Sequence, residues 1–349
     1  MVNSKLKNVN VSIDELVENI EIYENVALYG FGEFGQLIHC LFERSNALNK
    51  IKVVVDRSAE NGEYITDSVL VQSPEVLAAF KGATVIVASM SFADEIKQYL
   101  TQELSVSASK IIFVRMNELS AVDGAHSDKW REGAQEEIYF WEKSLATRHR
   151  RATLCELRVQ KDAAFNSDIV ALLANSDKST INVLDVGSGP VTALGYCSDK
   201  YNIQLNLVDP LANEYKHLYA KYQFYPPVVP EACRGEDVIE HFGERQFDVA
   251  YSCNALDHSE EPLKILHNMC HLLIGGGLLY VDVHENVAVE AGYAGLHQWN
   301  FTVEKGQVVL WNDTHRHLLA VELQTYGQLS LLQYDQNINS IKFCLTKST

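Results

Sequence analysis

Two stretches of the chain combine an apolar run with a glycine turn and a later acidic residue, a pattern that binds nucleotide-like ligands. The first is VALYGFGEFGQLIHC at 26–40, and Asp56 ends the apolar run that follows it. The second is VLDVGSGPVTALG at 183–195, and Asp209 ends its following run. Ligands of open parallel sheets bind beyond the carboxyl ends of the strands, so each turn is expected to share one ligand with its acidic residue.

The second turn is poorly suited to the pyrophosphate of a dinucleotide. Pyrophosphate sits on free backbone N–H groups at a helix start. Pro190 removes one such N–H, and Thr192 stands in place of a third glycine. Asp185 brings negative charge to the same opening. A phosphate-free nucleoside with cationic groups suits this turn better, and S-adenosylmethionine (SAM) carries a sulfonium and an ammonium group.

Residues 180–349 resemble the class I SAM-dependent methyltransferases, in this turn and in FDVAYSCNALDHSEEPLKILHNMCHLLIGGGLLYVDV at 247–283. The resemblance implies that the D-x-G-x-G turn lies under the methionine part of SAM and that Asp209 binds the ribose. A polar residue of RGEDVIEHF (234–242) is implied near the adenine. The implied cofactor residues are Asp185, Gly187, Ser188, Gly189, Asp209, Glu236 or Asp237, and Asn254. Each role has a structural alternative. Gly187 and Gly189 could serve only a turn that needs positive φ, and Asp209 could be the N-cap of a helix.

Polar residues that follow two later apolar runs are the candidates for catalysis. Methyl transfer to a hydroxyl requires that its proton be taken, and a positioned histidine does this well. His258 and His284 follow the runs at 247–253 and 277–283 and are equal candidates for the base, with Asp257 beside the first. His297, in the glycine-bearing loop AGYAGLHQWNF, ranks behind them. Each histidine has a structural alternative. His258 would cap a helix, His284 would bond to a backbone carbonyl, and His297 would pack in its loop.

A divalent cation that holds two acceptor oxygens is the alternative to a histidine base. Its ligands would come from Asp257, His258, His284 and Glu285, but these residues form no compact ligand motif, so no metal is predicted. EEIYFWEKSLATRHR and GLHQWNF resemble bacterial methyltransferases of surface-polysaccharide and other sugar modification. That resemblance implies a sugar or nucleotide-sugar hydroxyl as acceptor. Tyr293 and Trp299 would then stack on a sugar face or, alternatively, pack in the core.

Apolar runs alternate with helical patterns in two parts of the chain, which predicts two Rossmann-like α/β domains with parallel sheets. The predicted domains are an N-terminal Rossmann-like domain at 1–116, a helical connector that also roofs the second domain at 117–178, and a methyltransferase domain at 179–349. QVVLWN, HLLAVELQ, LSLLQYD and SIKFCLT, all beyond 305, lack intervening helices. They predict antiparallel strands at the edge of the second sheet.

The first glycine turn leaves a second function open. GFGEFG at 30–35 matches the dinucleotide fingerprint, so Gly30, Gly32, Gly35 and Asp56 would bind NAD(P) in an oxidoreductase or epimerase. Glu33 lies where the pyrophosphate would sit, which favours a scaffold or a homo-oligomer contact instead. A third reading is a nucleotide-binding protein without turnover.

Composition limits the partners and the location of the protein. A formal charge of −17 repels nucleic acid and anionic membranes, and the basic run RHRR at 148–151 is too short to reverse this. No signal peptide or membrane span is apparent, so a cytoplasmic protein with a small-molecule substrate is predicted. The seven scattered cysteines form no C-x-x-C pair and predict reduced thiols without structural zinc.

Overall fold

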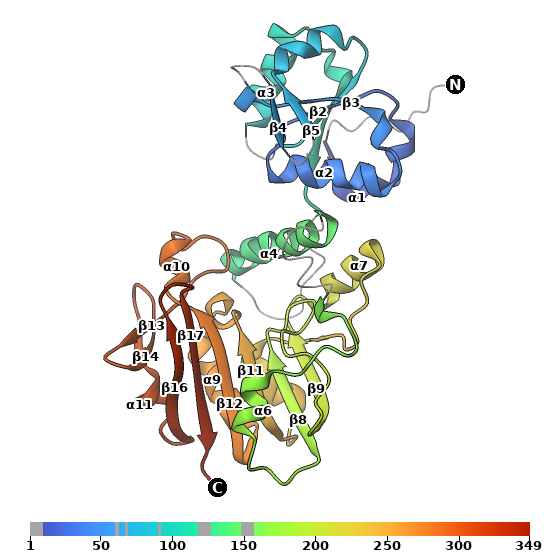
Figure 1. Cartoon of the computed structure of the whole chain (residues 1–349). Coiled ribbons are helices and arrows are strands. Elements are labelled where there is room, and N and C mark those ends of the chain that lie inside the picture. The colour runs from blue at the N-terminus through green and yellow to red at the C-terminus, as the bar shows by residue number, and fades with distance from the viewer. Residues whose placement is uncertain (1–9, 60–62, 67–68, 90–91, 118–126, 148–156) are drawn as a thin grey trace. The chain divides into compact units, whose positions relative to one another are not determined.

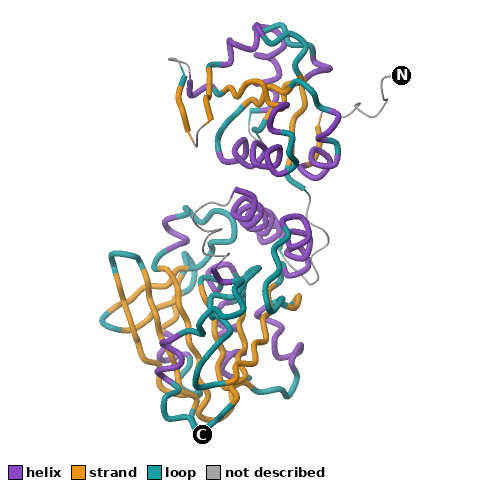
Figure 2. The backbone as a smooth tube through the Cα atoms, turned by 45° about the vertical axis from the view of Figure 1, so that its right-hand side comes forward, coloured by secondary structure: helices purple, strands orange, loops and turns teal. Residues whose placement is uncertain are grey.

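The computed structural model describes residues 10–59, 63–66, 69–89, 92–117, 127–147 and 157–349. The chain divides into two compact units, one of Met1–Glu118 with Ala146–Arg148 and one of Leu119–Leu145 with His149–Thr349. Each unit contains a large, mostly parallel sheet, which confirms the predicted α/β class (Figures 1 and 2). The RHRR run and Cys155 lie outside the described residues.

The sheet of the N-terminal unit has the order β1-β7-β6-β2-β3-β5-β4, in which only β4 and β5 pair antiparallel. Its central strands are almost fully buried, as expected for a parallel sheet covered on both faces. Strand β1 and the β4–β5 pair were not predicted because each strand has only three or four residues. The elements are β1 (Asn10–Ser12), α1 (Ile13–Glu18), β2 (Val26–Tyr29), α2 (Glu33–Arg44), β3 (Ile51–Val55), β4 (Tyr64–Thr66), β5 (Val69–Gln72), β6 (Thr84–Val87), α3 (Ala93–Gln98) and β7 (Ile111–Arg115).

The sheet of the second unit has the order β10-β9-β8-β11-β12-β17-β16. Strands β10 to β12 pair in parallel, and β17 and β16 form the predicted antiparallel edge. The chain runs outward from β8 to β10 on one side and then returns to β11 on the other, so the strand order reverses between β8 and β11. The strands are β8 (Thr180–Val186), β9 (Asn202–Asp209), β10 (Glu231–Ala232), β11 (Phe247–Cys253), β12 (Leu273–His284), β16 (Gly327–Asp335) and β17 (Ser340–Lys347).

Helices of the second unit connect and flank these strands (Figure 1). Helix α9 packs against the sheet: its Ile265, Leu266 and Met269 belong to the same buried core as residues of β11, β12 and β17. Helix α4 comes from the segment predicted as connector and roof. The helices are α4 (Asp128–Thr147), α6 (Ser167–Leu172), α7 (Ala212–Tyr222), α8 (Val238–Phe242), α9 (Pro262–His271), α10 (Val287–Glu290) and α11 (Leu319–Glu322).

Two predictions for the C-terminal part were wrong in detail. QVVLWN supplies β14 (Gln307–Trp311) of a separate three-stranded sheet with β13 (Asn300–Glu304) and β15 (Arg316–Leu318). HLLAVELQ leaves the strand conformation after Leu318 and forms α11. Leu319 and Leu323, four residues apart, are both fully buried, so one face of a helical turn satisfies the apolar pattern that was read as a strand.

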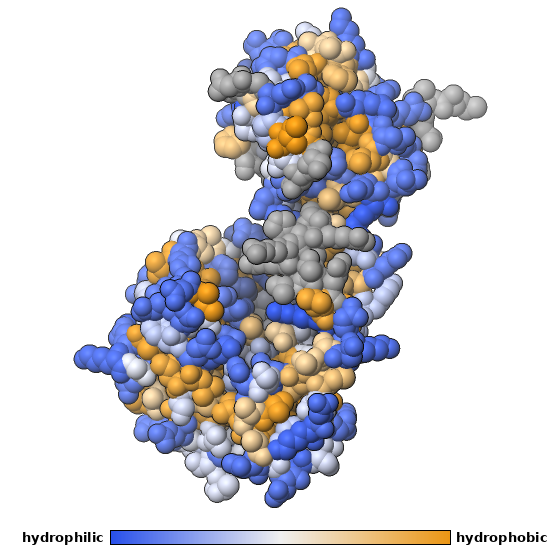
Figure 3. Space-filling model, in the orientation of Figure 1, coloured by the Kyte–Doolittle hydropathy of each residue, from blue (hydrophilic) through white to orange (hydrophobic). Residues whose placement is uncertain are grey.

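The helices, the surface and the cysteines of the described residues bear on the predictions from composition. None of the described helices combines the length and apolar composition that a membrane span needs. Apolar and hydrophilic residues are interspersed on the visible face of each unit (Figure 3). The six described cysteines are free thiols, and of these only Cys197 is exposed.

Candidate active site

A cavity of about 590 Å³ lies in the second unit at the carboxyl ends of its central strands. Residues that end or follow β8, β9, β11 and β12 line it, so it occupies the position where the strand order reverses. Four side chains of α4 also line the cavity: Trp130, Glu137, Phe140 and Trp141.

The glycine turn after β8 brings the backbone close to the loop after β11. Gly187 has φ +73°, and a Cβ on it would lie 2.3 Å from the Cβ of Ala255. Gly189 has φ +62° and lies against the ring of Trp141. Both glycines therefore have a packing reason in addition to their positive φ. Together with Ser188, they line the cavity.

Asp185 presents an unsatisfied carboxylate oxygen inside the protein. The side chain is 1% exposed, and its Oδ2 accepts a 2.6 Å hydrogen bond from Thr192 Oγ1. Its Oδ1 is buried without a hydrogen-bond partner among the described residues. Burial raises the pKa of Asp185 to about 7; the Thr192 bond and the charge of Arg158 lower it, while the charge of Asp209 raises it. Because such a group is costly when unpaired, a cationic ligand group in the cavity would stabilise it.

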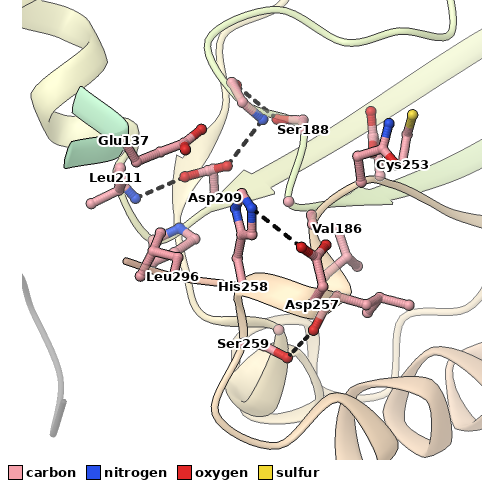
Figure 4. A pocket seen from close by; sticks show the side chains of 18 of the residues that line it. Glu137, Val186, Ser188, Asp209, Leu211, Cys253, Asp257, His258, Ser259 and Leu296 are labelled. Atoms are coloured by element: carbon pink, nitrogen blue, oxygen red, sulfur yellow. Dashed lines mark hydrogen bonds and ion pairs between the residues drawn. The ribbon is translucent and has the colours of Figure 1, made fainter. Parts of the chain in front are cut away.

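Asp209, at the end of β9, is hydrogen-bonded to the glycine turn after β8 (Figure 4). Its two oxygens accept hydrogen bonds from Gly189 N at 3.0 Å and Leu211 N at 2.9 Å. Burial raises the pKa of Asp209 to about 6, although these amide hydrogen bonds oppose the rise. Helix α7 starts at Ala212 with Leu211 as its N-cap, so Asp209 is not the N-cap that the alternative required. The side chain of Tyr215 also hydrogen-bonds to this carboxylate, so one of its four lone pairs remains for a ligand hydroxyl.

The two acidic residues predicted near the adenine lie in different surroundings. Glu236 lines the cavity, but its Oε1 accepts hydrogen bonds from the backbone N–H groups of Glu260 and Glu261, both at 3.2 Å. Asp237 is about half exposed and is not among the lining residues. Glu236 therefore orders the start of α9 beside the cavity.

Three of the predicted catalytic side chains converge on one point of the cavity wall (Figure 4 shows two of them). His297 Nδ1 lies 2.8 Å from Asp257 Oδ2 and 3.1 Å from His258 Nε2, and His258 Nε2 lies 3.4 Å from the same Oδ2. Burial opposes ionisation of Asp257, but the two histidines offset it and hold the pKa of Asp257 below its usual value. The hydrogen bond to Asp257 raises the pKa of His297.

The fourth candidate, His284, lines the cavity apart from this group. Asn254, with φ +47°, accepts a 2.9 Å hydrogen bond from His284 N on its Oδ1. His284 Nδ1 lies 3.3 Å from the carbonyl oxygen of Asn339. Glu285, predicted beside it as a possible ligand, is instead hydrogen-bonded to Thr302 and Tyr334.

Neither aromatic residue expected to stack on a sugar lines the cavity. Trp299 is 9% exposed and belongs to the core, so the packing alternative describes it. Tyr293 accepts a hydrogen bond from Asn300 at 3.2 Å. The ring-bearing tyrosine, tryptophan and phenylalanine side chains on the cavity wall come instead from α4, α7 and β11: Trp130, Phe140, Trp141, Tyr215 and Tyr251.

Sequence reasoning named no individual lining residue between 117 and 178. Trp130, Glu137 and Trp141 recur at intervals of seven and four, which places them on one face of a helix, and this spacing was a usable signal. Glu137 Oε1 accepts a hydrogen bond from Trp141 Nε1 at 2.8 Å. Arg158 lines the cavity, and its positive charge lowers the pKa of Asp185. It belongs to no sequence motif, so the sequence did not indicate its role.

In the N-terminal unit, packing accounts for Gly30 and Gly35 of the first turn, whereas a Cβ on Gly32 would have nothing within 4 Å. A Cβ on Gly35 would lie 2.0 Å from the carbonyl oxygen of Gly30, and one on Gly30 would lie 3.0 Å from that of Ala88. Asp56 accepts hydrogen bonds from Phe31 N at 2.6 Å and from the backbone and side chain of Ser58. Asp56 thus ties its glycine turn to the end of the next strand in the same way as Asp209 does in the second unit.

Fold and site together define a class I, Rossmann-like methyltransferase. Residues 149–327, more than half of the chain, match a family described as "Methyltransferase domain". The chain therefore belongs to this family and is a SAM-dependent methyltransferase. A comparison with curated proteins gave no match.

A comparison with solved structures matched methyltransferases at low sequence identity and low TM-score. The 1,6-didemethyltoxoflavin-N1-methyltransferase of Burkholderia thailandensis is 16% identical with a TM-score of 0.37, and the match covers 66% of this chain and 95% of that one. N-methyltransferase NodS from Bradyrhizobium japonicum is 10% identical with a TM-score of 0.34 (52% and 94% covered). The CurJ carbon methyltransferase is 12% identical with a TM-score of 0.37 (91% and 81%). Likeness at this level says nothing about the acceptor.

Proposed function

We propose that the amino-acid end of SAM lies between Asp185 and Arg158 in the cavity of the second unit. The observation that carries this proposal is the buried, unpartnered Oδ1 of Asp185, which a ligand ammonium would satisfy. Arg158 lines the same cavity and offers a positive charge to the ligand carboxylate. The two charges thus match the ammonium and the carboxylate of an amino acid, a pair of groups that NAD(P) lacks.

The nucleoside end then lies toward Asp209. The carboxylate of Asp209 would accept a hydrogen bond from a ribose hydroxyl while it continues to bond Gly189 N and Leu211 N. The α4 side chains Trp141 and Phe140 belong to the apolar lining of the cavity and would help to exclude water from the methyl group. A volume of about 590 Å³ is within the range of small-molecule sites, roughly 300–1,000 Å³.

We further propose that the acceptor is a hydroxyl of a small molecule, of the sugar or nucleotide-sugar class. His284 is the histidine best placed as base. A carbonyl oxygen can only accept, so the contact with Asn339 O requires the proton on Nδ1 and leaves the lone pair of Nε2 to take the acceptor's proton. The oxygen then attacks the methyl carbon, the O–CH₃ bond forms, the C–S bond breaks, and S-adenosylhomocysteine (SAH) leaves.

Calorimetric titration with SAM, SAH, NAD and NADP tests the cofactor site. We expect SAM and SAH to bind and Asp209→Ala to weaken SAH about 10- to 100-fold, as the loss of hydrogen bonds to a charged group requires. Asp248→Ala is the matched control, because Asp248 is equally buried but bonds to Lys178 and Asn182 away from the cavity. Equal SAH affinity in Asp209→Ala and the wild type would reject the ribose assignment.

Screening sugars and nucleotide sugars for methyl transfer, with mass detection of the product, tests the acceptor and the base. His284→Gln is expected to lower turnover about 10²- to 10⁴-fold with SAH affinity unchanged. His271→Gln, an exposed histidine at the end of α9, is the control. Full turnover in His284→Gln excludes it as the base.

A further inference from the structure

We propose that Asp257, His258 and His297 form a binding site for a first-row divalent cation in the wall of the active-site cavity. These three residues, called the triad below, each offer one ligand atom, and the three atoms lie within 4.8 Å of one another. Sequence reasoning predicted no metal and, as its alternative, grouped Asp257 and His258 with His284 and Glu285. The fold instead brings in His297, which is 40 residues from Asp257 along the chain.

The separations of the ligand atoms match those around a metal ion. The triangle of Asp257 Oδ2, His258 Nε2 and His297 Nδ1 has edges of 2.8, 3.1 and 3.4 Å. Metal–ligand bonds of about 2.1 Å, at octahedral or tetrahedral angles, separate neighbouring ligand atoms by about 3.0–3.4 Å. One cation can therefore contact all three atoms with small adjustments of the side chains.

Hydrogen bonding alone satisfies the triad less well. His297 Nδ1 carries at most one proton, yet it faces both Asp257 Oδ2 and His258 Nε2. If that proton is donated to Asp257, then Nδ1 has no lone pair left for an N–H of His258, whose other acceptor in the group, Asp257 Oδ2, lies at a long 3.4 Å. A cation resolves this conflict because it takes one lone pair from each of the three atoms.

Exposure and charge favour a cation that a substrate can reach. The side chains of Asp257, His258 and His297 are 7%, 20% and 36% exposed, and all three line the cavity. Three protein ligands leave coordination positions open, as in catalytic metal sites. Glu137 on α4 lines the same cavity and adds a negative charge. Two imidazole nitrogens with one carboxylate oxygen suit Zn²⁺, Fe²⁺ or Mn²⁺ better than Ca²⁺.

This inference rests on the proposed function where it assigns the cation a task. The acceptor hydroxyl would occupy an open position, and the cation would lower the pKa of that hydroxyl. Its proton would pass to His284 Nε2, and its oxygen would take the methyl group from the sulfonium of SAM. The charge gained by the oxygen is neutralised as the O–CH₃ bond forms and the neutral thioether of SAH leaves.

Metal binding can be measured without any acceptor. The full chain is treated with a chelator, dialysed against Co²⁺ or Zn²⁺, and analysed for bound metal by mass spectrometry of the elements and by the visible spectrum of Co²⁺. Co²⁺ is a suitable probe because N/O sites bind it more tightly than Mn²⁺ or Fe²⁺. We expect one ion per chain in the wild type and in the control His271→Gln.

Conservative changes in the triad should remove the ion. His258→Gln and His297→Gln are expected to weaken Co²⁺ binding at least tenfold, since even changes to residues behind the ligands cost 10- to 100-fold. SAH titration of the same variants without metal shows that they are folded, and Asp257→Asn provides a third variant. Wild-type protein without stoichiometric metal, or variants that bind it as tightly as the wild type, would overturn the proposal. Failure of SAH binding alone would reject the proposed cofactor site and leave the triad intact.

Discussion

At the scale of single residues, ionisation of Asp185 is expected to make the ligand-free protein less stable, and a cationic ligand is expected to compensate for this. Its pKa rises from an ordinary 3.8 to about 7 because the carboxyl is buried. Between these pH values the folded protein holds a proton on Asp185 that the unfolded chain has released. The free energy of unfolding therefore decreases as the pH rises from about 4 to about 7 on account of this group, and the decrease ends above its folded pKa. A charge needed for binding thus destabilises the ligand-free fold.

Asp185→Asn is expected to stabilise the ligand-free protein and to weaken SAM binding. The wild type should lose about 1.4 kcal/mol of unfolding free energy per pH unit until the pH reaches the folded pKa of Asp185, whereas the variant should not. The stabilisation by the substitution should therefore be about 2 kcal/mol larger at pH 8 than at pH 5.5. Asparagine can still accept the hydrogen bond of Thr192. Urea unfolding of both proteins at the two pH values measures the difference. A gain that does not change with pH would mean that Asp185 is not protonated in the folded protein.

At the scale of elements, the sequence was most informative where the signal is local. The β8 turn was predicted because Asp185, Gly187 and Gly189 are adjacent and their chemistry depends on the turn itself. The triad was not predicted as a group, because the position of His297 depends on how loop 292–298 packs, which no short pattern encodes. HLLAVELQ was read wrongly for a related reason: burial of Leu319 and Leu323 is compatible with a strand or a helix until the neighbouring elements are known.

Packing between α4 and this loop is tight enough to be tested by one methyl group. A Cβ on Gly133 of α4 would lie 2.6 Å from both Gly295 C and Leu296 N. Gly133→Ala should strengthen α4 itself by about 1 kcal/mol. It should nevertheless displace the backbone beside His297 and lower turnover by up to about a hundredfold, the cost of misplacing a catalytic group by about 1 Å.

Steady-state kinetics together with circular dichroism would separate these two effects. Glu132→Ala, at the exposed neighbouring position of α4, is the control and should retain activity. If Gly133→Ala turns over at the wild-type rate, α4 does not set the position of the loop.

At the scale of the whole molecule, the two compact units are expected to respond separately to the cofactor. The four tryptophans, Trp130, Trp141, Trp299 and Trp311, all belong to the second unit. Tryptophan fluorescence therefore reports unfolding of the second unit alone, whereas far-ultraviolet circular dichroism reports both units.

Heating with and without SAH should then resolve two transitions. At 100 times its dissociation constant, SAH adds about 2.7 kcal/mol to the unfolding free energy of the unit that binds it. For a unit of this size, that corresponds to a rise of about 5–10 °C in the fluorescence midpoint. Unfolding of the N-terminal unit is seen by circular dichroism but not by fluorescence. The midpoint temperature of that transition should not change, because no part of the proposed SAM site comes from the N-terminal unit. A common shift of both transitions would show that the units unfold together and that cofactor binding stabilises the chain as a whole.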